Sequence, residues 1–282
     1  MRMFRKIFLA LLMAAGCALL GAPAQAQDSA STPIVLENPH YWLARPLKKA
    51  ASLSAAVGYP YGWHRNHQSP IHHGVDFVNP QGTPVLAAAD GTVYYAGSDQ
   101  ERLFGERANF YGNLVIIQHN LEAPEGGRIF TLYGHLSYVA VQSGERVRQG
   151  DRIGAVGATG IALGNHLHFE VRIGAAESYF AVRNPELWYA PLPGTGTLIG
   201  RLLNADGSKA LGIRVTLAAP KRALYTFTYA DPSVPRDPAL DENFTLADAP
   251  AGCYRLRVRG TALDVPVCLR AGQTVFVEAR LP

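Results

Sequence analysis

The sequence predicts an all-β protein, with an antiparallel β domain that carries the candidate catalytic residues and a second, small β-sandwich domain after it. Three observations support this prediction. Short runs of β-branched and aromatic residues alternate with polar ones. Glycine and proline, 28 and 19 residues respectively, punctuate these runs as turn signals. Long segments with the apolar period of an amphipathic helix are absent from the sequence. Strands and tight turns are therefore expected throughout.

The first 26 residues have the features of a secretory signal peptide. Arg2, Arg5 and Lys6 form a basic start, residues 7–20 an apolar stretch, and residues 24–26 (Ala-Gln-Ala) a small-residue cleavage site. The apolar stretch is short for a membrane helix and ends in a cleavage signal. We expect cleavage near Ala26 and a periplasmic or secreted mature chain without a membrane span.

Charge gives little support for a nucleic-acid partner. The chain has 26 Lys and Arg against 22 Asp and Glu, and removal of the signal peptide leaves 23 against 22, a net charge of +1. No basic run with interleaved aromatic residues occurs. Cys17, which follows two small residues, is a weaker signal for a lipoprotein site inside the same segment.

Histidine distribution predicts the domain boundaries. All nine histidines lie between His40 and His168, and the last 114 residues contain none. We therefore expect residues 27–57 as a lead-in, 58–189 as the first domain and 197–282 as the second. The breaker-rich segment 190–196 is the expected linker.

Turn and strand signals place three strands in the first domain. Asp90-Gly91 reads as a hairpin turn before a strand at residues 92–96. Residues 114–118 and 128–133 are the other two strands. The second domain is expected to alternate around the turn Asp206-Gly207.

The segment His166-Leu-His-Phe-Glu170 is the strongest chemical signal. Its alternation is that of a strand, on which side chains two apart share a face. His166, His168 and Glu170 then point one way, while Leu167 and Phe169 point into a core. Two imidazoles and a carboxylate on one face can hold and tune a metal. An isolated pattern of this kind is more often an ordinary polar face of a hairpin.

A second cluster upstream favours the metal-site interpretation. His72 and Asp76 converge if the chain bends at Gly74. With one histidine of the later pair they supply three N/O ligands and leave a fourth position open for water, as in catalytic zinc sites. A surface turn with incidental histidines is the alternative. A third histidine, His135, lies between the clusters.

These residues lie within motifs that resemble the lysostaphin-type zinc endopeptidases, also called the LytM or DD-endopeptidase family. The resemblance runs from about Gly58 to Pro185, through HHGVDF, GTPVLAAADGTV, YGNLVIIQH, TLYGHLS, VRQGDRIGAVGATG and GNHLHFEVR. It implies one Zn²⁺ per chain, with His72, Asp76 and His168 as metal ligands. It also implies catalytic roles for His135 and His166, without dividing them.

The resemblance implies hydrolysis of peptide cross-links of peptidoglycan by metal-activated water, with stem peptides as the substrate. Two alternatives remain open: a non-catalytic cell-wall-binding or hydrolase-activator module, and a secreted peptidase acting on glycine-rich protein. Glu170 is expected either to orient a ligand histidine or to form an ordinary salt bridge. His119 is expected to be structural, and His73 to face away from the site. Asn38 or His40 is expected to pack on the surface rather than cap the metal.

The second domain has motifs of its own. GRLLNADG, GIRVTL and FTLADAPAGCYRLRV resemble the small β-sandwich regulatory domain of carboxypeptidases. This implies a scaffold or docking role and a possible protein partner. Cys253 and Cys268 flank a strand–turn–strand pattern, so a disulfide is plausible in an oxidising compartment, with buried free thiols as the alternative.

Overall fold

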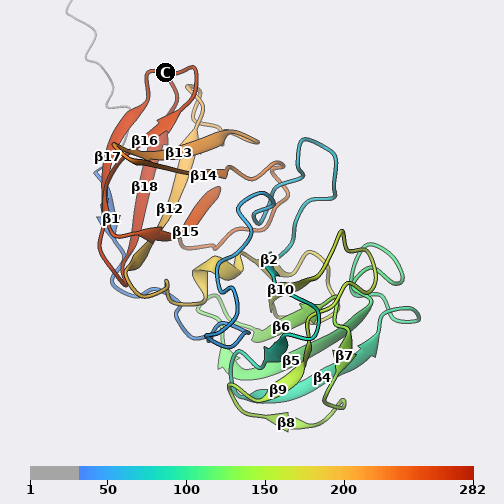
Figure 1. Cartoon of the computed structure of the whole chain (residues 1–282). Coiled ribbons are helices and arrows are strands. Elements are labelled where there is room, and N and C mark those ends of the chain that lie inside the picture. The colour runs from blue at the N-terminus through green and yellow to red at the C-terminus, as the bar shows by residue number, and fades with distance from the viewer. Residues whose placement is uncertain (1–31) are drawn as a thin grey trace, which may run out of the picture.

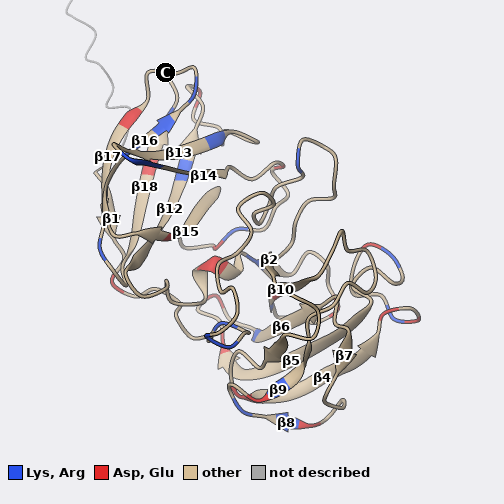
Figure 2. Ribbon diagram, viewed as in Figure 1, with Lys and Arg blue, Asp and Glu red and all other residues tan. Residues whose placement is uncertain are grey.

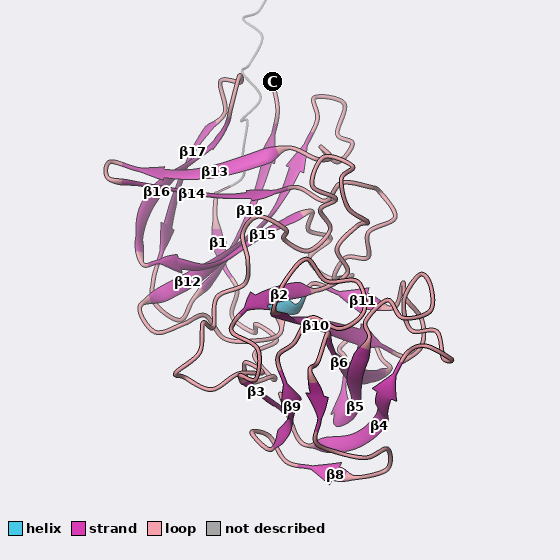
Figure 3. Ribbon diagram, turned by 45° about the vertical axis from the view of Figure 1, so that its right-hand side comes forward, coloured by secondary structure: helices cyan, strands magenta, loops and turns pink. Residues whose placement is uncertain are grey.

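The computed structural model describes residues 32–282 and is almost entirely β (Figures 1 and 3). Within that range the one helical element is a 3-10 turn, η1 (Pro185–Leu187). The signal-peptide prediction lies outside the described residues. The part of the chain that the structure describes contains no helix with the length and apolar character needed to cross a bilayer.

The first group of strands surrounds the histidine-bearing segments. Its members are β2 (Val75–Val78), β3 (Pro84–Leu86), β4 (Gly91–Ser98), β5 (Asn113–Glu122), β6 (Arg128–Gly134), β7 (Tyr138–Val139), β8 (Arg146–Val147), β9 (Arg152–Ala155), β10 (His166–Ile173) and β11 (Val182–Arg183).

These strands form two antiparallel sheets. The larger has seven strands in the order β11-β10-β6-β5-β4-β8, with β2 also paired to β10. The smaller has the order β3-β9-β7. Side chains such as Phe77, Val115, Leu167 and Phe169 alternate inward and form the core that joins the sheets. The strands β4, β5 and β6 are largely free of charged residues, which gather in loops and at strand ends (Figure 2).

The second group of strands follows residue 194. It comprises β12 (Thr195–Leu203), β13 (Arg214–Ala219), β14 (Arg222–Phe227), β15 (Phe244–Pro250), β16 (Gly252–Val258), β17 (Asp264–Leu269) and β18 (Thr274–Arg280). We refer to residues 195–282 as the C-terminal module.

The C-terminal module has two four-stranded sheets around a shared core. One has the order β14-β13-β16-β17, and the other β1-β18-β12-β15, in which β1 (Ile34–Val35) comes from the lead-in. Leu198, Val215, Leu256 and Val277 are among the buried residues that pack between them. β12 and β18 run parallel, a pairing that turn signals do not predict. Cys253 and Cys268 face each other across β16 and β17 and are bridged, so the disulfide prediction is confirmed.

The lead-in contacts both groups of strands. Leu43 and Leu47 are buried in the core of the first group. Arg45 forms an ion pair with Asp248 at 2.6 Å, on the C-terminal module. The lead-in therefore ties the two groups together, as the blue trace in Figure 1 shows.

The all-β prediction is confirmed, and the predicted strands correspond to β4, β5, β6 and β10. One prediction is wrong: Asp90-Gly91 is not a hairpin turn. β3, which precedes it, pairs with β9, while β4 pairs with β5 and β8. The chain passes from one sheet to the other at this point, and a local turn signal does not distinguish such a passage from a hairpin.

Candidate active site

Three neighbouring strands bring the predicted site residues together. β10 pairs with β2 on one side and with β6 on the other. In this register His168 lies directly opposite Asp76 and next to Gly134, after which β6 ends and His135 follows. Directly opposed residues of an antiparallel pair project to the same face. The sheet therefore determines the positions of these side chains.

Gly74 allows His72 to approach this face. A Cβ at Gly74 would lie 2.4 Å from the carbonyl oxygen of Phe169 and 2.8 Å from Nε2 of His168. Any side chain there would push the His72 segment away from β10. The expected bend is present at Gly74, but the close approach of β10 is what requires glycine.

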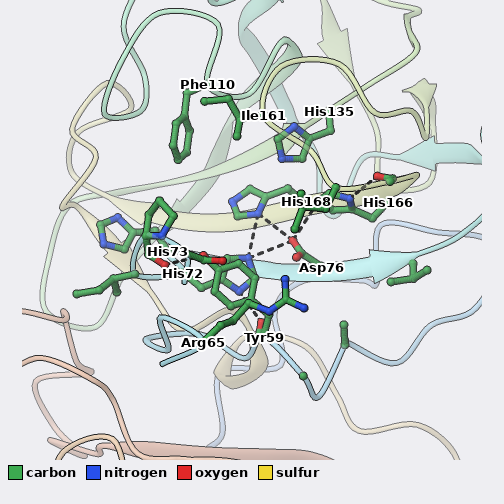
Figure 4. Close-up of a pocket in the computed structure, with 18 of the residues that line it drawn as sticks. Tyr59, Arg65, His72, His73, Asp76, Phe110, His135, Ile161, His166 and His168 are labelled. Carbon is green, nitrogen blue, oxygen red and sulfur yellow. Dashed lines mark hydrogen bonds and ion pairs between the residues drawn. The ribbon is translucent and has the colours of Figure 1, made fainter. Parts of the chain in front are cut away.

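The donor atoms of His72, Asp76 and His168 converge on one point. His72 Nε2 lies 3.1 Å from Asp76 Oδ1, and His168 Nδ1 lies 3.0 Å from the same oxygen. The two imidazole nitrogens are 3.2 Å apart. These three residues form a group with the composition and spacing of a metal site (Figure 4).

The tautomer of His72 is determined by a backbone carbonyl. Nδ1 of His72 lies 2.6 Å from the carbonyl oxygen of Tyr59, which can only accept a hydrogen bond. Nδ1 therefore carries the proton and donates it, and Nε2 of the neutral ring presents a lone pair. The ring of Tyr59 stacks on His72 with centroids 4.1 Å apart and the planes 3° from parallel.

His168 is oriented by a buried carboxylate. Its Nε2 lies 3.0 Å from Oε1 of Glu170, and Glu170 Oε2 accepts from Nε of Arg172 at 2.7 Å. Glu170 and Arg172 are fully buried, and the hydroxyl of Tyr111 also donates to Glu170. Burial opposes ionisation of Glu170, but Arg172 and His168 outweigh it and hold the pKa of Glu170 well below its usual range.

The geometry fits a bound divalent cation. With Nδ1 of His72 and Nε2 of His168 donating outward, the facing nitrogens and Asp76 Oδ1 present lone pairs to one another at about 3 Å. Such a group needs a positive charge at its centre. Two imidazoles and a carboxylate are a donor set that suits zinc.

His135 and His166 lie beside this group, and each is anchored by a hydrogen bond from Nδ1 to a backbone carbonyl. Nδ1 of His135 donates to the carbonyl of Thr159 at 2.9 Å, and Nδ1 of His166 to the carbonyl of Gly164 at 2.8 Å. Their rings are 4.7 Å apart, and His166 Nε2 is 3.6 Å from Asp76 Oδ1. Each neutral ring thus keeps an unprotonated Nε2.

His135 has two further properties. Its backbone is left-handed, with φ of 62°, which is uncommon for a residue with a side chain. Burial, followed by the neighbouring His168 and His166, lowers the pKa of His135 to about 3. The ring is therefore neutral at physiological pH.

The donor group and the two histidines line a cleft of about 500 Å³. Its walls are mostly apolar and aromatic, and Leu163 and Val78 at its rim are 90% and 61% exposed. Arg65 also lines the cleft, beside the ring of Tyr59 (Figure 4). A cleft with apolar walls and a small set of convergent polar groups has the character of a ligand-binding site.

The structure brings all five predicted site residues into this cleft, namely His72, Asp76, His135, His166 and His168. Glu170 both orients His168 and forms a salt bridge, so the two interpretations left open for it are compatible. His119 is fully buried outside the cleft and contacts Thr131, as expected for a structural residue. His40 contacts Asp237 and does not reach the cleft.

Sequence reasoning missed Tyr59, Tyr111 and Arg172. Arg172 continues the alternation of His166, His168 and Glu170 by one step, so the signal for it was present. Tyr59 and Tyr111 reach the site through tertiary contacts that local spacing does not reveal. His73 hydrogen bonds to the carbonyl of Tyr179 and stays outside the donor group, although it lines the cleft wall.

Comparison with known proteins finds peptidases that are similar to the part of the chain that carries the cleft. The model of peptidase family M23 matches residues 70–179. A DD-carboxypeptidase/endopeptidase, Mpg, of Neisseria meningitidis is 39% identical over 120 residues, covering 42% of this chain and 24% of that protein. The peptidoglycan DD-endopeptidase ShyC of Vibrio cholerae is 41% identical over 103 residues, covering 36% and 20%. The chain thus matches a quarter or less of the length of these relatives.

Among solved structures, the catalytic domain of the antimicrobial peptidase lysostaphin from Staphylococcus simulans is 30% identical. The match covers 47% of this chain and 86% of that one, with a TM-score of 0.36. The family resemblance that the sequence motifs predict is confirmed by the family match. The resemblance of the C-terminal module to carboxypeptidase regulatory domains stays a prediction.

Proposed function

We propose, from the premise that residues 70–179 form a peptidase family M23 domain, that this protein is a zinc-dependent endopeptidase of peptidoglycan cross-links. The observation that carries the proposal is the convergence of His72, Asp76 and His168 on one point, with unprotonated nitrogens facing a carboxylate. His135 and His166 beside them complete a hydrolytic constellation.

His72, Asp76 and His168 would hold the zinc ion. When bound there, zinc acts as a Lewis acid that polarises a peptide carbonyl and lowers the pKa of water. Glu170 holds the imidazole of His168 in the orientation that turns Nδ1 toward Asp76. The carbonyl of Tyr59 does the same for Nε2 of His72.

His135 and His166 would handle the protons of the reaction. Hydrolysis requires a proton to leave the attacking water and another to reach the leaving amine. Each ring is anchored through Nδ1 and presents Nε2 as the atom that accepts and then donates a proton. Because burial keeps His135 neutral, its Nε2 is available as an acceptor. A ring protonated in this way also stabilises the negative charge that develops on the substrate.

The substrate is proposed to be the peptide stems of peptidoglycan. The names of Mpg and ShyC connect similar sequences to DD-endopeptidase activity and, for ShyC, to peptidoglycan. The cleft is open enough for an extended, cross-linked peptide, with Leu163 and Val78 available at its rim. A periplasmic or secreted location, predicted from residues 1–26, would give access to the cell wall.

Digestion of purified cross-linked muropeptides tests the proposal. We expect conversion of dimers to monomers, inhibition by a chelator and recovery with added zinc. A glycine-rich protein in a parallel reaction is expected to stay intact. Cleavage of that protein with no muropeptide product would instead support the secreted-peptidase alternative.

His166→Ala separates the enzyme from the activator alternative. The substitution removes a proton-transfer group but leaves the three proposed ligands, so zinc binding should persist while cleavage is lost. If cells carrying this variant remodel their wall normally, the non-catalytic activator alternative is favoured.

A further inference from the structure

Apart from its contacts with Asp76 and His168, the proposed ligand His72 is held by residues 59–63, which we call the 59–63 turn. The backbone N–H of His72 donates to the carbonyl of Trp63 at 2.9 Å, and its carbonyl accepts from Gly62 at 2.8 Å. The ring Nδ1 donates to the carbonyl of Tyr59, whose own ring covers the imidazole face. Backbone, tautomer and ring plane of His72 thus all depend on this turn.

The opposite side of the 59–63 turn contacts the C-terminal module. Trp63 stacks on Phe227 of β14, with ring centroids 4.2 Å apart and the planes 9° from parallel. Tyr61 meets Tyr229 edge to face at 5.3 Å. The N–H of Ala230 donates to the carbonyl of Gly62 at 2.7 Å. Gly62 therefore joins the C-terminal module to His72 through its two backbone groups.

Gly62 shows how closely the two parts fit. Its φ is 75°, and its N–H lies in a turn in which Trp63 N–H reaches the carbonyl of Pro60 at 3.2 Å. A Cβ on Gly62 would lie 2.5 Å from Cδ1 of Tyr229 and 3.1 Å from Cγ1 of Val234. Any side chain at this position would push the turn and the C-terminal module apart.

Tyr229 is a rigid support for this contact. It is 1% exposed, its hydroxyl donates to the fully buried Glu242 at 2.7 Å, and Asn184 Nδ2 donates to the same hydroxyl at 3.3 Å. Its backbone N–H donates to the carbonyl of Asn243. Movement of Tyr229 would therefore break several buried hydrogen bonds, each of which is unfavourable to leave unmade.

We propose that the C-terminal module is a positioning element of the metal site, which acts by holding the 59–63 turn against His72. The inference rests on the proposed function, because it gives the module a role in metal binding. One side of the turn contacts Phe227, Tyr229 and Ala230, and the other side contacts His72. Figure 4 shows Tyr59 beside His72, on which its ring stacks. Coupling of this kind is reciprocal, so zinc binding should also strengthen the contact between turn and module.

Three variants of the full chain test this inference. Phe227→Ala removes the stacking partner of Trp63, and Gly62→Ala introduces the Cβ that meets Tyr229. Phe227→Tyr keeps the stack and serves as the conservative rescue. We expect zinc affinity, measured by competition with a chelating dye, to fall by about 2- to 10-fold in the first two variants, as for the loss of one aromatic stack. Phe227→Tyr should bind zinc as the wild type does.

A matched control separates positioning from general destabilisation. Val267→Ala removes two methyl groups from the core of the C-terminal module, away from the turn. It should lower the unfolding temperature of the protein while leaving zinc affinity and the visible spectrum of the Co²⁺-loaded protein unchanged. Phe227→Ala should alter that spectrum. If Phe227→Ala and Gly62→Ala bind zinc like the wild type, or if Val267→Ala weakens binding equally, the inference is overturned.

A metal-free measurement distinguishes this inference from the proposed function. The ¹⁵N shifts of the His72 ring report which nitrogen carries the proton. In the metal-free protein we expect a single Nδ1–H tautomer for the wild type and a mixture for Phe227→Ala. If the wild type binds no zinc but its His72 tautomer still differs from that of Phe227→Ala, the proposed function is contradicted and the positioning role is retained. An unchanged tautomer in Phe227→Ala would contradict the positioning role itself.

Discussion

The two histidines of the donor group are held in contrasting ways. His168 lies on a central strand, and its partner Glu170 is two residues away in the same strand. His72 lies in a loop, and its partners Tyr59, Gly62 and Trp63 come from a turn that is itself supported by residues more than 150 positions away. His168 is fixed by a buried ion pair, and His72 by aromatic packing and backbone hydrogen bonds.

This difference shows that one part of such a site can be held by residues close in sequence, while another part is held by residues far away in sequence. We call these the local half and the remote half. The anchor of His168 is contained in the alternation of one strand, with Arg172 compensating the charge of Glu170. The anchor of His72 depends on how the C-terminal module meets the rest of the chain. Substitutions in the first anchor should act through charge, and those in the second through packing.

Asp76→Ala breaks both halves at once and should have the largest effect. Asp76 Oδ1 lies within 3.1 Å of both ligand histidines, and removing it leaves two imidazoles without the carboxylate that completes the donor set. We expect zinc affinity and cleavage to fall by more than the roughly 100-fold loss that follows from removing a residue that only orients a metal ligand. Zinc titration and muropeptide digestion measure the two losses, and Asp90→Ala, outside the cleft, is the matched control.

Glu170→Gln tests the anchor of His168. The variant keeps the size of the side chain but removes the charge that orients His168 and pairs with Arg172. We expect zinc affinity to fall by about 10- to 100-fold. Stability should fall by roughly 3–5 kcal/mol, since Arg172 stays buried without its anionic partner. Urea unfolding gives the second quantity. Wild-type stability in this variant would show that the ion pair contributes little.

Tyr59→Ala tests the anchor of His72 with a smaller expected effect. The backbone carbonyl that sets the tautomer remains, while the stacked ring and the hydrogen bond from its hydroxyl to the carbonyl of Pro70 are lost. Stacking of this kind contributes about 0.5–1.5 kcal/mol, so we expect zinc affinity to fall by about 2- to 10-fold. Tyr59→Phe keeps the stacked ring and loses only the hydrogen bond to Pro70, so it should bind zinc more tightly than Tyr59→Ala. A loss as large as that of Glu170→Gln would mean that the two anchors do not differ in kind.

His119, outside both anchors, should affect stability without affecting zinc binding. Burial lowers the pKa of His119 from 6.5 to about 4. The unfolded chain therefore binds an additional proton between these values, and stability is lost as pH falls from about 6.5 toward 4. This loss should be on the order of 3 kcal/mol. Denaturant unfolding from pH 7 to 4 should show a shallower pH dependence for His119→Gln. An identical dependence in both proteins would contradict this assignment.

The contrast between the two anchors also explains which site residues could be predicted from the sequence and which could not. The strand with His166, His168 and Glu170 was predictable because side-chain direction follows from alternation alone. His72 and Asp76 were predictable as a pair, but the role of Gly74 in admitting β10 was not. Tyr59, Phe227 and Tyr229 were unpredictable, since their contacts join residues far apart in the chain. The Asp90-Gly91 turn was misread because strand pairing is decided by tertiary structure rather than by the turn residues.

Metal content together with chelator-sensitive cleavage tests the central claim most directly. The mature protein is purified without added metal and analysed for bound elements, and release of monomers from cross-linked peptidoglycan is followed with and without chelator. The account predicts about one zinc ion per chain and cleavage that is lost with chelator and restored by zinc. A protein without bound metal that cleaves equally well in chelator would contradict it.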